Sequence, residues 1–285
     1  MKEFPIPVRV TGPGSQPEDA DFSYMPFPRD VPTFSMPQVP ENAEAAAMAA
    51  AHDLLAGFVD AMGNGETRLE LAGFDPGGLE VLNQTLGEGE VSIRIAFANG
   101  AAHDIRIQET VFAGVWRECH YAADGRVLHD YLHAGPIPPI AIELAQSGAA
   151  AALDDFVLTP GAMNAPALLA EIRHQVKAFR PHDAAHVINL TLLPLSPEDV
   201  ELLDRVIPAG PVRILSRGFG NCRITSTGLR HLWRVQYFNS MQTLILNTME
   251  VVRVPEVALA AEEDLAESRA RLVDLVDWMG QPAAA

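Results

Sequence analysis

The chain has 285 residues, 48% of them hydrophobic, and a formal net charge of −17 at pH 7. This length and composition suit one large domain or two smaller ones, each with a real apolar core. The negative charge argues against nucleic acid and against an anionic membrane surface as partners, because both are bound through clustered Lys and Arg.

The cysteine content and the N-terminal sequence bear on the cellular compartment. Cys119 and Cys222 are the two cysteines of the sequence, too few for a disulfide framework, so we expect a reducing cytoplasm. Two cysteines also cannot supply a four-cysteine zinc or iron–sulfur site within one chain. MKEFPIPVRV lacks the apolar run of a signal peptide. Finding no apolar segment long enough to span a bilayer, we expect no membrane insertion.

Residues 1–45 are expected to form an extended, proline-rich leader. Nine of the 22 prolines lie within residues 1–40, and proline this dense forbids helix and disfavours sheet. The leader also carries five aromatic residues: Phe4, Phe22, Tyr24, Phe27 and Phe34. Two interpretations stay open, a disordered tail or an extended arm that lies on the protein or grips a partner.

Beyond the leader, the sequence repeats itself. DPGGLEVLNQTLGEGEVSI aligns with SPEDVELLDRVIPAGPVRI at an offset of 121 residues, and DIRIQETVFAGVWR aligns with NCRITSTGLRHLWR at an offset of 117. Two of the three tryptophans, Trp116 and Trp233, fall on matching positions, and an arginine follows each. We interpret this pattern as a diverged tandem duplication. The first repeat is expected over residues 46–160 and the second over residues 161–285.

Both repeats predict the same order of elements. An amphipathic helix is predicted for AAAMAAAHDLLAGFVDAM and for APALLAEIRHQVKAF, the second with Asn164 as its N-cap. A short strand follows in RLELAGF or HVINLTLL, and then a helix opened by Asp75 or Ser196 before proline. Three strands come next. The middle one has an alternative interpretation, as two strands separated at Gly114 in the first repeat or at Gly228 in the second. The chain ends in a helix after Pro255, whose counterpart in the first repeat, IAIELAQSGAAAALDDF, is less well formed.

These elements predict an α+β fold, a tandem duplication of a unit of about 100 residues with pseudo-twofold symmetry. Each unit is a helix, a strand, a helix and antiparallel strands, since such short connections suit antiparallel pairing. Positions that are alike in both repeats are expected to be structural. The matching pairs assigned to packing or to buried or interfacial ion pairs are Trp116/Trp233, Arg117/Arg234 and Arg106/Arg223.

SRGFGNCRITSTG, residues 216–228, is the strongest candidate site, because a polar loop flanked by glycines is typical of a functional site. Cys222 lies near Arg217 and Arg223, and nearby positive charge lowers the pKa of a thiol and raises its reactivity. The alternative is a small hydrophobe on a strand, since the first repeat has Ile105 at this position. Three interpretations of this stretch therefore stay open: a client-contact site, an active centre or a plain turn. Polar residues on the following strands could line a groove or be ordinary edge residues: Gln236, Asn239, Asn247 and Thr248.

No catalytic constellation emerges from the sequence. Nothing resembles a nucleophile elbow, and GPGSQ in the leader lacks the lysine and the following helix of a phosphate-binding loop. We therefore expect no enzymatic activity and no cofactor, with Cys222 as a weak metal candidate. An acidic chain of this kind indicates a binder of a basic partner.

The segments SRGFGNCRIT, WRVQYFNSM and LILNTMEV resemble the signature of the HupH/HyaF family of hydrogenase expression proteins. The leader FPIPVRVTGPGSQPED and the segment IQETVFAGVWR are similar to that family too, so the resemblance covers most of the chain. Phe219 departs from the tyrosine that is commoner there. Carried over by position, the family-like residues are Arg217, Gly218, Gly220, Asn221, Cys222, Arg223, Trp233, Gln236, Asn239, Asn247 and Glu250.

The resemblance implies a cytoplasmic accessory protein for the assembly of membrane-bound uptake nickel–iron hydrogenase, without established enzymatic activity. It implies that the protein holds the iron–sulfur small-subunit precursor before export, together with a thioredoxin-like accessory protein. One hypothesis is a chaperone that grips this precursor in the cleft between the repeats. The alternative is a thiol- or metal-handling assembly factor that uses Cys222 for iron–sulfur cluster assembly or repair. A structural bridge between maturation factors is weaker, and a homodimer is left open.

Overall fold

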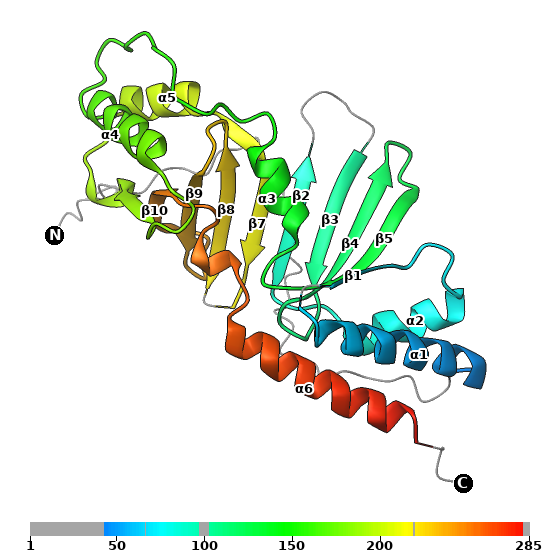
Figure 1. Ribbon diagram of the computed structural model, residues 1–285. Coiled ribbons are helices and arrows are strands. Elements are labelled where there is room, and N and C mark those ends of the chain that lie inside the picture. The colour runs from blue at the N-terminus through cyan, green and yellow to red at the C-terminus, as the bar shows by residue number, and fades with distance from the viewer. Residues whose placement is uncertain (1–42, 66, 97–102, 219, 282–285) are drawn as a thin grey trace, which may run out of the picture.

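The computed structural model describes residues 43–65, 67–96, 103–218 and 220–281, so nearly all of the expected leader lies outside the described residues. The described chain forms one ten-stranded sheet with helices packed against it (Figure 1). Every strand pairs antiparallel with its neighbours, as the pairings from β1 to β6 across the sheet show. The α+β class is therefore confirmed.

The first repeat supplies one half of the sheet. Its elements are α1 (Ala45–Met62), β1 (Thr67–Glu70), α2 (Pro76–Leu86), β2 (Val91–Ala96), β3 (His103–Glu109), β4 (Val115–Ala122), β5 (Val127–Ala134) and α3 (Pro139–Gln146). The interpretation of the middle segment as two strands separated near Gly114 is correct, because β3 and β4 are separate strands. Gly114 has φ of 74°, a left-handed conformation that glycine adopts without steric cost. The helix expected around residues 140–156 is confirmed only as far as Gln146.

The second repeat supplies the other half. Its elements are α4 (Ala165–Ala178), β6 (His186–Asn189), the short 3₁₀ helix η1 (Leu190–Leu192), α5 (Pro197–Val206), β7 (Ala209–Ser216), β8 (Asn221–Thr227), β9 (Leu232–Phe238), β10 (Leu244–Val251), η2 (Glu256–Ala258) and α6 (Glu262–Met279). The strand expected over residues 186–193 is shorter than predicted, because the side chain of Asn189 accepts the N–H groups of Thr191 and Leu192 and starts η1.

The predicted helix caps are confirmed at two of three positions. Asp75 accepts a hydrogen bond from Gly78 N–H at the start of α2, and Ser196 forms a capping box with Asp199 at the start of α5. The expectation for Asn164 is wrong: its side chain donates to the Pro194 carbonyl and caps nothing in α4. Instead, the carboxylate of Asp199 accepts the N–H groups of Met163, Asn164 and Ala165, at the residues just before α4 and at its first residue.

The strand order places matching strands of the two repeats at equal distances from the centre: β1-β5-β4-β3-β2-β7-β8-β9-β10-β6. β2 and β7 join the repeats, and there Ile93 pairs with Ile214, its own counterpart at the offset of 121. Two copies of one unit, placed edge to edge and antiparallel, produce this pairing. The repeat bounds at 46–160 and 161–285 stay a prediction.

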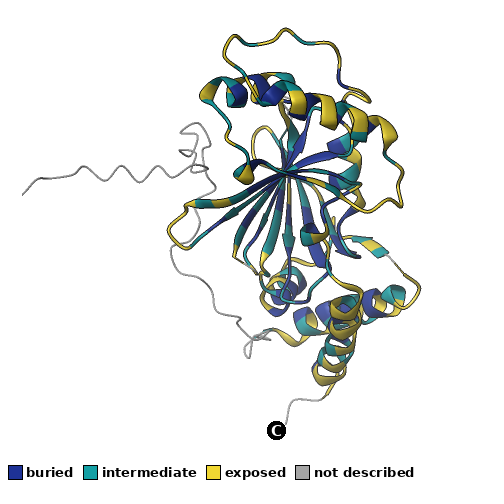
Figure 2. Cartoon of the chain, turned by 90° about the vertical axis from the view of Figure 1, so that its left-hand side faces the viewer, coloured by how far each residue is buried: buried dark blue, intermediate teal, exposed yellow. Residues whose placement is uncertain are grey.

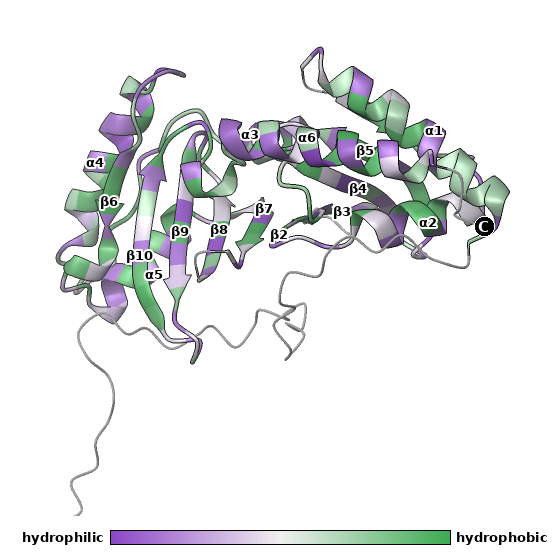
Figure 3. Ribbon diagram, turned by 90° about the horizontal axis from the view of Figure 1, so that it is seen from below, coloured by the Kyte–Doolittle hydropathy of each residue, from purple (hydrophilic) through white to green (hydrophobic). Residues whose placement is uncertain are grey.

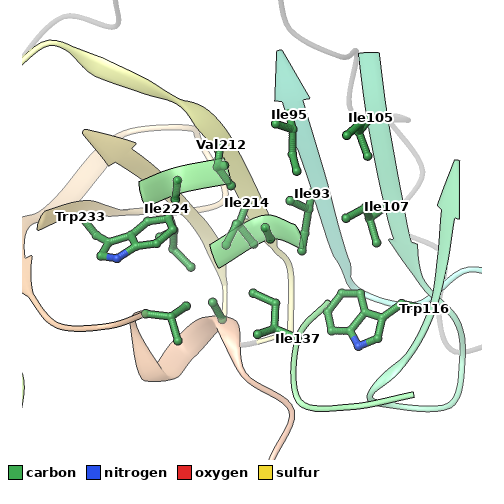
Figure 4. Close-up of a cluster of buried hydrophobic side chains, with 14 of the residues drawn as sticks. Ile93, Ile95, Ile105, Ile107, Trp116, Ile137, Val212, Ile214, Ile224 and Trp233 are labelled. Carbon is green, nitrogen blue, oxygen red and sulfur yellow. The ribbon is translucent and has the colours of Figure 1, made fainter. Parts of the chain in front are cut away.

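One face of the central strands is apolar and packs under α3 and the segment around η2 (Figure 4). We call it the α3 face. Trp116 and Trp233 flank it and are 0% and 1% exposed, so the prediction that they serve packing is confirmed. The labelled side chains of this face are Ile93, Ile95, Ile105, Ile107, Trp116, Ile137, Val212, Ile214, Ile224 and Trp233.

The opposite face of the sheet is covered at its two ends. At one end α1, α2 and α6 pack around Val115 and Leu132, and at the other end α4 and α5 pack around Met249 and Val251. Figure 2 shows these two helix groups apart from each other, with their exposed residues turned outward. The middle strands therefore present their second face between two helical layers.

Helix α1 corrects one expectation from the sequence. By length and composition alone it could cross a membrane, with a mean hydropathy of 1.2 over 18 residues. Leu55, Phe58 and Val59 of this helix are buried in the core with α2 and α6. The core helix of a soluble protein passes the same test, so this property of α1 is weak support for a membrane span.

Candidate functional site

In the stretch over residues 216–228, Ser216 ends β7, Asn221–Thr227 form β8, and a short turn lies between them, whose Phe219 is outside the described residues. The N–H of Arg217 donates to the Glu90 carbonyl at 3.1 Å, which ties the turn to the residue before β2. Gly220 has φ of 100°, a conformation that favours glycine. Gly218 precedes this position, and Asn221 begins β8. The glycines of the stretch thus serve a turn between two central strands.

Cys222 lies on the α3 face and is 3% exposed, packed among the isoleucines of that cluster. Burial raises the pKa of its thiol to about 11, and a hydrogen bond with Tyr237 offsets this only in part. Arg223 points to the other face because side chains alternate along a strand. The expectation that Arg217 and Arg223 lower this pKa is therefore wrong. The structure favours the alternative, a small hydrophobe at the position of Ile105.

Three of the predicted polar residues do come together, on the face opposite Cys222. Arg223 pairs with Gln236 across β8 and β9, and Gln236 pairs with Asn247 across β9 and β10. Asn239 is apart from them, since its side chain accepts the N–H groups of Met241 and Thr243 in the turn after β9. The predicted site residues are thus divided between two faces and a turn, and their role in client binding stays a prediction.

Asn247 also has a scaffold role that the duplication explains. Its Oδ1 accepts from Arg234 Nε at 3.2 Å, and Arg234 Nη1 pairs with Asp204 Oδ1 of α5 at 3.1 Å. The first repeat holds the same arrangement at the matching positions. There Arg117 pairs with Asp130 and bonds Asn83 of α2. The predicted ion pairs of Arg117 and Arg234 are confirmed, and each fastens its strand to a helix.

The face opposite α3 carries a row of arginines, and we call it the arginine face. Its members come from six strands: Arg94, Arg106, Arg117, Arg213, Arg223 and Arg234. Asp104 accepts from Arg94 Nε at 3.3 Å and from Arg106 Nε at 2.9 Å. Burial lowers the pKa of Arg213, and the neighbouring charges of Arg94 and Arg223 lower it further.

Sequence reasoning missed this row because the net charge of the chain hides it. A signal was present, however: four strands carry an apolar residue, an arginine and an isoleucine in succession, as IRI, IRI, VRI and CRI. Figure 3 shows the resulting alternation of hydrophilic and hydrophobic residues along the central strands. The ring contacts repeat as well, with Arg106 over Tyr121 at 4.7 Å and Arg223 over Phe238 at 5.0 Å.

A second polar cluster, also missed, lies on the α3 side of the sheet in the first repeat. Glu118 is 1% exposed and bonds both Arg68 and His120 at 2.6 Å. His133 is 2% exposed, and burial lowers its pKa to about 4. Tyr131 lies under the Arg68 guanidinium at 3.5 Å. In the part of the chain that the structure describes, no group of three or more His, Cys, Asp or Glu side chains is placed to hold a metal ion.

Beside this cluster, a cavity of about 590 Å³ lies between α1 and β1. It is lined mainly by apolar side chains of α1, with Arg68, Glu70 and Phe74 on the other wall. The cavity is separate from the predicted site in the second repeat. It has the size of a small-molecule pocket.

Comparison with known proteins connects both repeats to one family. The model of the HupH hydrogenase expression protein, C-terminal conserved region, matches residues 41–155 and again residues 162–279. This double match supports the internal repeat.

The similarity to curated proteins extends over nearly the whole chain. The chain is 43% identical to hydrogenase expression/formation protein HoxQ of Cupriavidus necator, over 98% of this chain and 99% of that protein. It is 40% identical to hydrogenase expression/formation protein HupH of Rhodobacter capsulatus, over 97% and 98%. It is 32% identical to hydrogenase-1 operon protein HyaF of Escherichia coli, over 96% and 97%. A solved structure of hydrogenase expression protein HupH from Thiobacillus denitrificans is 29% identical, with a TM-score of 0.38, and covers 40% of this chain and 95% of that one. The chain therefore belongs to the HupH family of hydrogenase expression proteins.

Proposed function

We propose that this protein is a non-enzymatic accessory protein of nickel–iron uptake hydrogenase maturation that binds the iron–sulfur small-subunit precursor before export. The observation that carries the proposal is the near full-length similarity to proteins named for hydrogenase expression and formation. The precursor as client, a thioredoxin-like second partner and the cytoplasm as location follow from the family resemblance. The buried, high-pKa thiol of Cys222 gives no support to the thiol-handling alternative.

The charge of the chain supports a basic client. An export signal of the twin-arginine type is basic at its start, and a protein of net charge −17 attracts it over a distance. The first turn of α6 presents three exposed carboxylates, Glu262, Glu263 and Asp264. The arginine face repels such a signal, so we place the contact on the acidic turn of α6.

The two repeats give the proposed scaffold its shape. We infer a pseudo-twofold axis that passes between Ile93 and Ile214, the one matching pair that is also paired in the sheet. The repeated contacts of Arg117 and Arg234 with the neighbouring helices support this axis. That the protein forms a homodimer stays a prediction, and a measurement of its mass in solution tests it.

Binding of purified small subunit to the immobilised full chain tests the proposal. We expect capture of the precursor and weaker capture of small subunit that lacks its export signal. The variant Glu262→Gln/Glu263→Gln/Asp264→Asn is expected to slow association several-fold at low salt and to flatten its salt dependence. The control variant Glu267→Gln/Asp274→Asn/Asp277→Asn removes the same charge further along α6 and is expected to bind as the wild type does. Failure of the full chain to capture the precursor would contradict the proposed function.

A further inference from the structure

The cavity between α1 and β1 opens beside an edge of the sheet. β1 ends the strand order, and among the described residues no further strand pairs with its outer side. The N–H of Leu71 donates to the Asp130 carbonyl at 2.7 Å, which continues the register of β1 with β5. Because the backbone groups of successive residues point to opposite sides of a strand, Arg68 and Glu70 turn their N–H and C=O groups outward. An extended segment can therefore pair with this edge.

The helical wall of this cavity, which we call the α1 groove, is a row of small and apolar residues. Ala50, Leu54, Gly57 and Ala61 line it at helical spacing along α1. These residues extend over about 16 Å and the four residues of β1 over about 13 Å, so the groove has the length of about four extended residues. A glycine inside a helix lowers its stability relative to alanine, yet a Cβ at Gly57 would have nothing within 4 Å. Packing therefore does not explain this glycine, whereas an open groove does.

The second repeat closes the corresponding place. Helix α4 matches α1 at the offset of 117 residues, and β6 is the edge strand at the other end of the sheet. There His186 Nε2 of β6 lies 2.8 Å from Glu171 Oε1 of α4, so an ion pair joins the helix to the edge strand. The matching helix residue in the first repeat is Leu54, and Gly57 matches His174. The groove thus belongs to one copy of a shared scaffold, which favours a function over a requirement of the fold.

The rim of the groove is acidic. The side chain of Asp53 on α1 is 83% exposed, and that of Glu70 on β1 is 51% exposed. Arg68 is the one cation among the described residues that line the groove, and its guanidinium is already held by other groups. It bonds Glu118 at 2.6 Å and lies over the Tyr131 ring at 3.5 Å. Two accessible carboxylates therefore remain for a cationic occupant.

The alternation of side chains along a strand defines the sequence of this occupant. Leu69 packs toward the core of α1 and α2, whereas Arg68 and its neighbour Glu118 lie on the other side of the sheet. A segment paired with β1 therefore turns every second side chain into the groove and the others toward Glu70. Opposite charges on adjacent strands stabilise the pairing, and like charges destabilise it. Apolar residues that alternate with Lys or Arg satisfy both sides.

We propose that the α1 groove binds an extended segment of a partner protein in which apolar residues alternate with Lys or Arg. The segment pairs with the outer edge of β1, places its apolar side chains against Leu54, Gly57 and Leu69, and directs its basic side chains to Glu70 and Asp53. A second copy of this chain fits less well, because its β1 has Leu69 as its one apolar side chain for a cavity of about 590 Å³. The groove is independent of the contact placed on α6, so the failure of either site leaves the other standing.

Fluorescence anisotropy of labelled synthetic peptides with the full chain tests the site. The probe is a peptide of about eight residues in which Val and Lys alternate. A peptide of alternating Ser and Lys keeps the charge and lacks the apolar side chains, and a peptide of alternating Val and Glu reverses the charge. We expect the Val–Lys peptide to bind at least about tenfold more tightly than either control peptide, the change expected when the burial of one valine is lost.

Two variants of the full chain block the groove in different ways. Gly57→Leu fills it, and leucine is a better helix former than glycine. Its control is Ala270→Leu, which adds the same side chain at an exposed position of α6. Glu70→Pro removes an outward N–H that β5 does not use, and proline is tolerated on edge strands. Its match is Glu70→Gln, which removes the charge and keeps the N–H.

We expect Gly57→Leu and Glu70→Pro each to weaken binding of the Val–Lys peptide about tenfold. Glu70→Gln is expected to weaken it about threefold, the range of a partly exposed ion pair, and Ala270→Leu to bind as the wild type does. Circular dichroism checks that each variant is folded, and Gly57→Leu decides alone if Glu70→Pro is not.

Four results would contradict the site. Equal binding of the Val–Lys and Ser–Lys peptides would reduce the effect to general charge attraction. Wild-type binding by Gly57→Leu would show that the groove is not used. Weakening by Gly57→Leu but not by folded Glu70→Pro would exclude strand pairing and assign the cavity to a small apolar ligand. A wild-type dimer that Glu70→Pro converts to a monomer would assign the edge of β1 to a second copy.

Discussion

Replacement of Asp199 by asparagine is expected to destabilise the protein by about 2–4 kcal/mol, because one buried carboxylate joins the starts of two helices. Its Oδ1 accepts the N–H groups of Met163, Asn164 and Ala165 at 2.8, 2.9 and 2.9 Å. Its Oδ2 accepts the N–H of Ser196 at 3.0 Å, and the side chain is 0% exposed. Asparagine keeps the size but turns an NH₂ group toward N–H donors on one of these two sides. At least one buried donor then loses its partner, and the others lose a charged acceptor.

The first repeat provides a matched control. Asp75 occupies the N-cap position that corresponds to Ser196, and it accepts a single hydrogen bond from Gly78 N–H at 2.7 Å. Asp75→Asn is therefore expected to cost at most about 1 kcal/mol, the range of an ordinary N-cap. Urea unfolding followed by circular dichroism measures both variants. An Asp199→Asn loss no larger than that of Asp75→Asn would refute the reasoning.

The same carboxylate predicts a pH dependence. Burial acts to raise the pKa of Asp199, but the four backbone N–H groups outweigh it and hold the pKa below its ordinary value. A carboxyl with a depressed pKa in the folded protein stabilises it above the unfolded pKa, about 3.9, and this stabilisation is lost as the pH falls through the folded value. The difference between wild type and Asp199→Asn is expected to be constant from about pH 8 to 5 and to shrink below about pH 4. A difference that persists undiminished at pH 3 would contradict this account.

Two further predictions concern buried groups of the central strands. Cys222→Ala is expected to lower the free energy of unfolding by about 1 kcal/mol and to leave hydrogenase formation in cells unchanged; loss of hydrogenase activity with a folded variant would restore the thiol hypothesis. Burial raises the pKa of Glu109 to about 7, although Gly114 N–H donates to it at 3.0 Å. Because the folded carboxyl then binds its proton more tightly than the unfolded one, stability falls as the pH rises from about 4.5 to 7. Glu109→Gln is expected to remove this slope and to be more stable above pH 7 by up to about 3 kcal/mol, and parallel pH profiles of the two proteins would speak against it.

Local sequence determined most of the elements and the duplication. The caps of α2 and α5 were predictable because Asp75 and Ser196 precede proline, and capping depends on neighbouring residues alone. Trp116 and Trp233 were predictable as core residues because both repeats keep them. The strands were predictable from the alternation of apolar and polar residues. The end of β6 was not, because it depends on the side chain of Asn189, which starts η1.

The candidate site shows the limit of this reasoning. Proximity in sequence placed Cys222 between two arginines and predicted a reactive thiol. In a strand, however, successive side chains point to opposite faces, so Cys222 is buried under α3 while Arg223 is on the arginine face. Which face becomes the core is decided by what packs on it, and the residues of α3 are more than 60 positions away from those of β7 in the sequence.

The sequence by itself determined that this chain is two copies of one α+β unit, because periodicity, caps and the matching of the repeats are local properties. Only the tertiary structure decided that β2 pairs with β7, that Asp199 serves two helices, and that four arginines from both repeats share one face. Each of these depends on contacts between residues far apart in the chain. Their free energy comes from burial and charge in the assembled sheet, which no single segment contains.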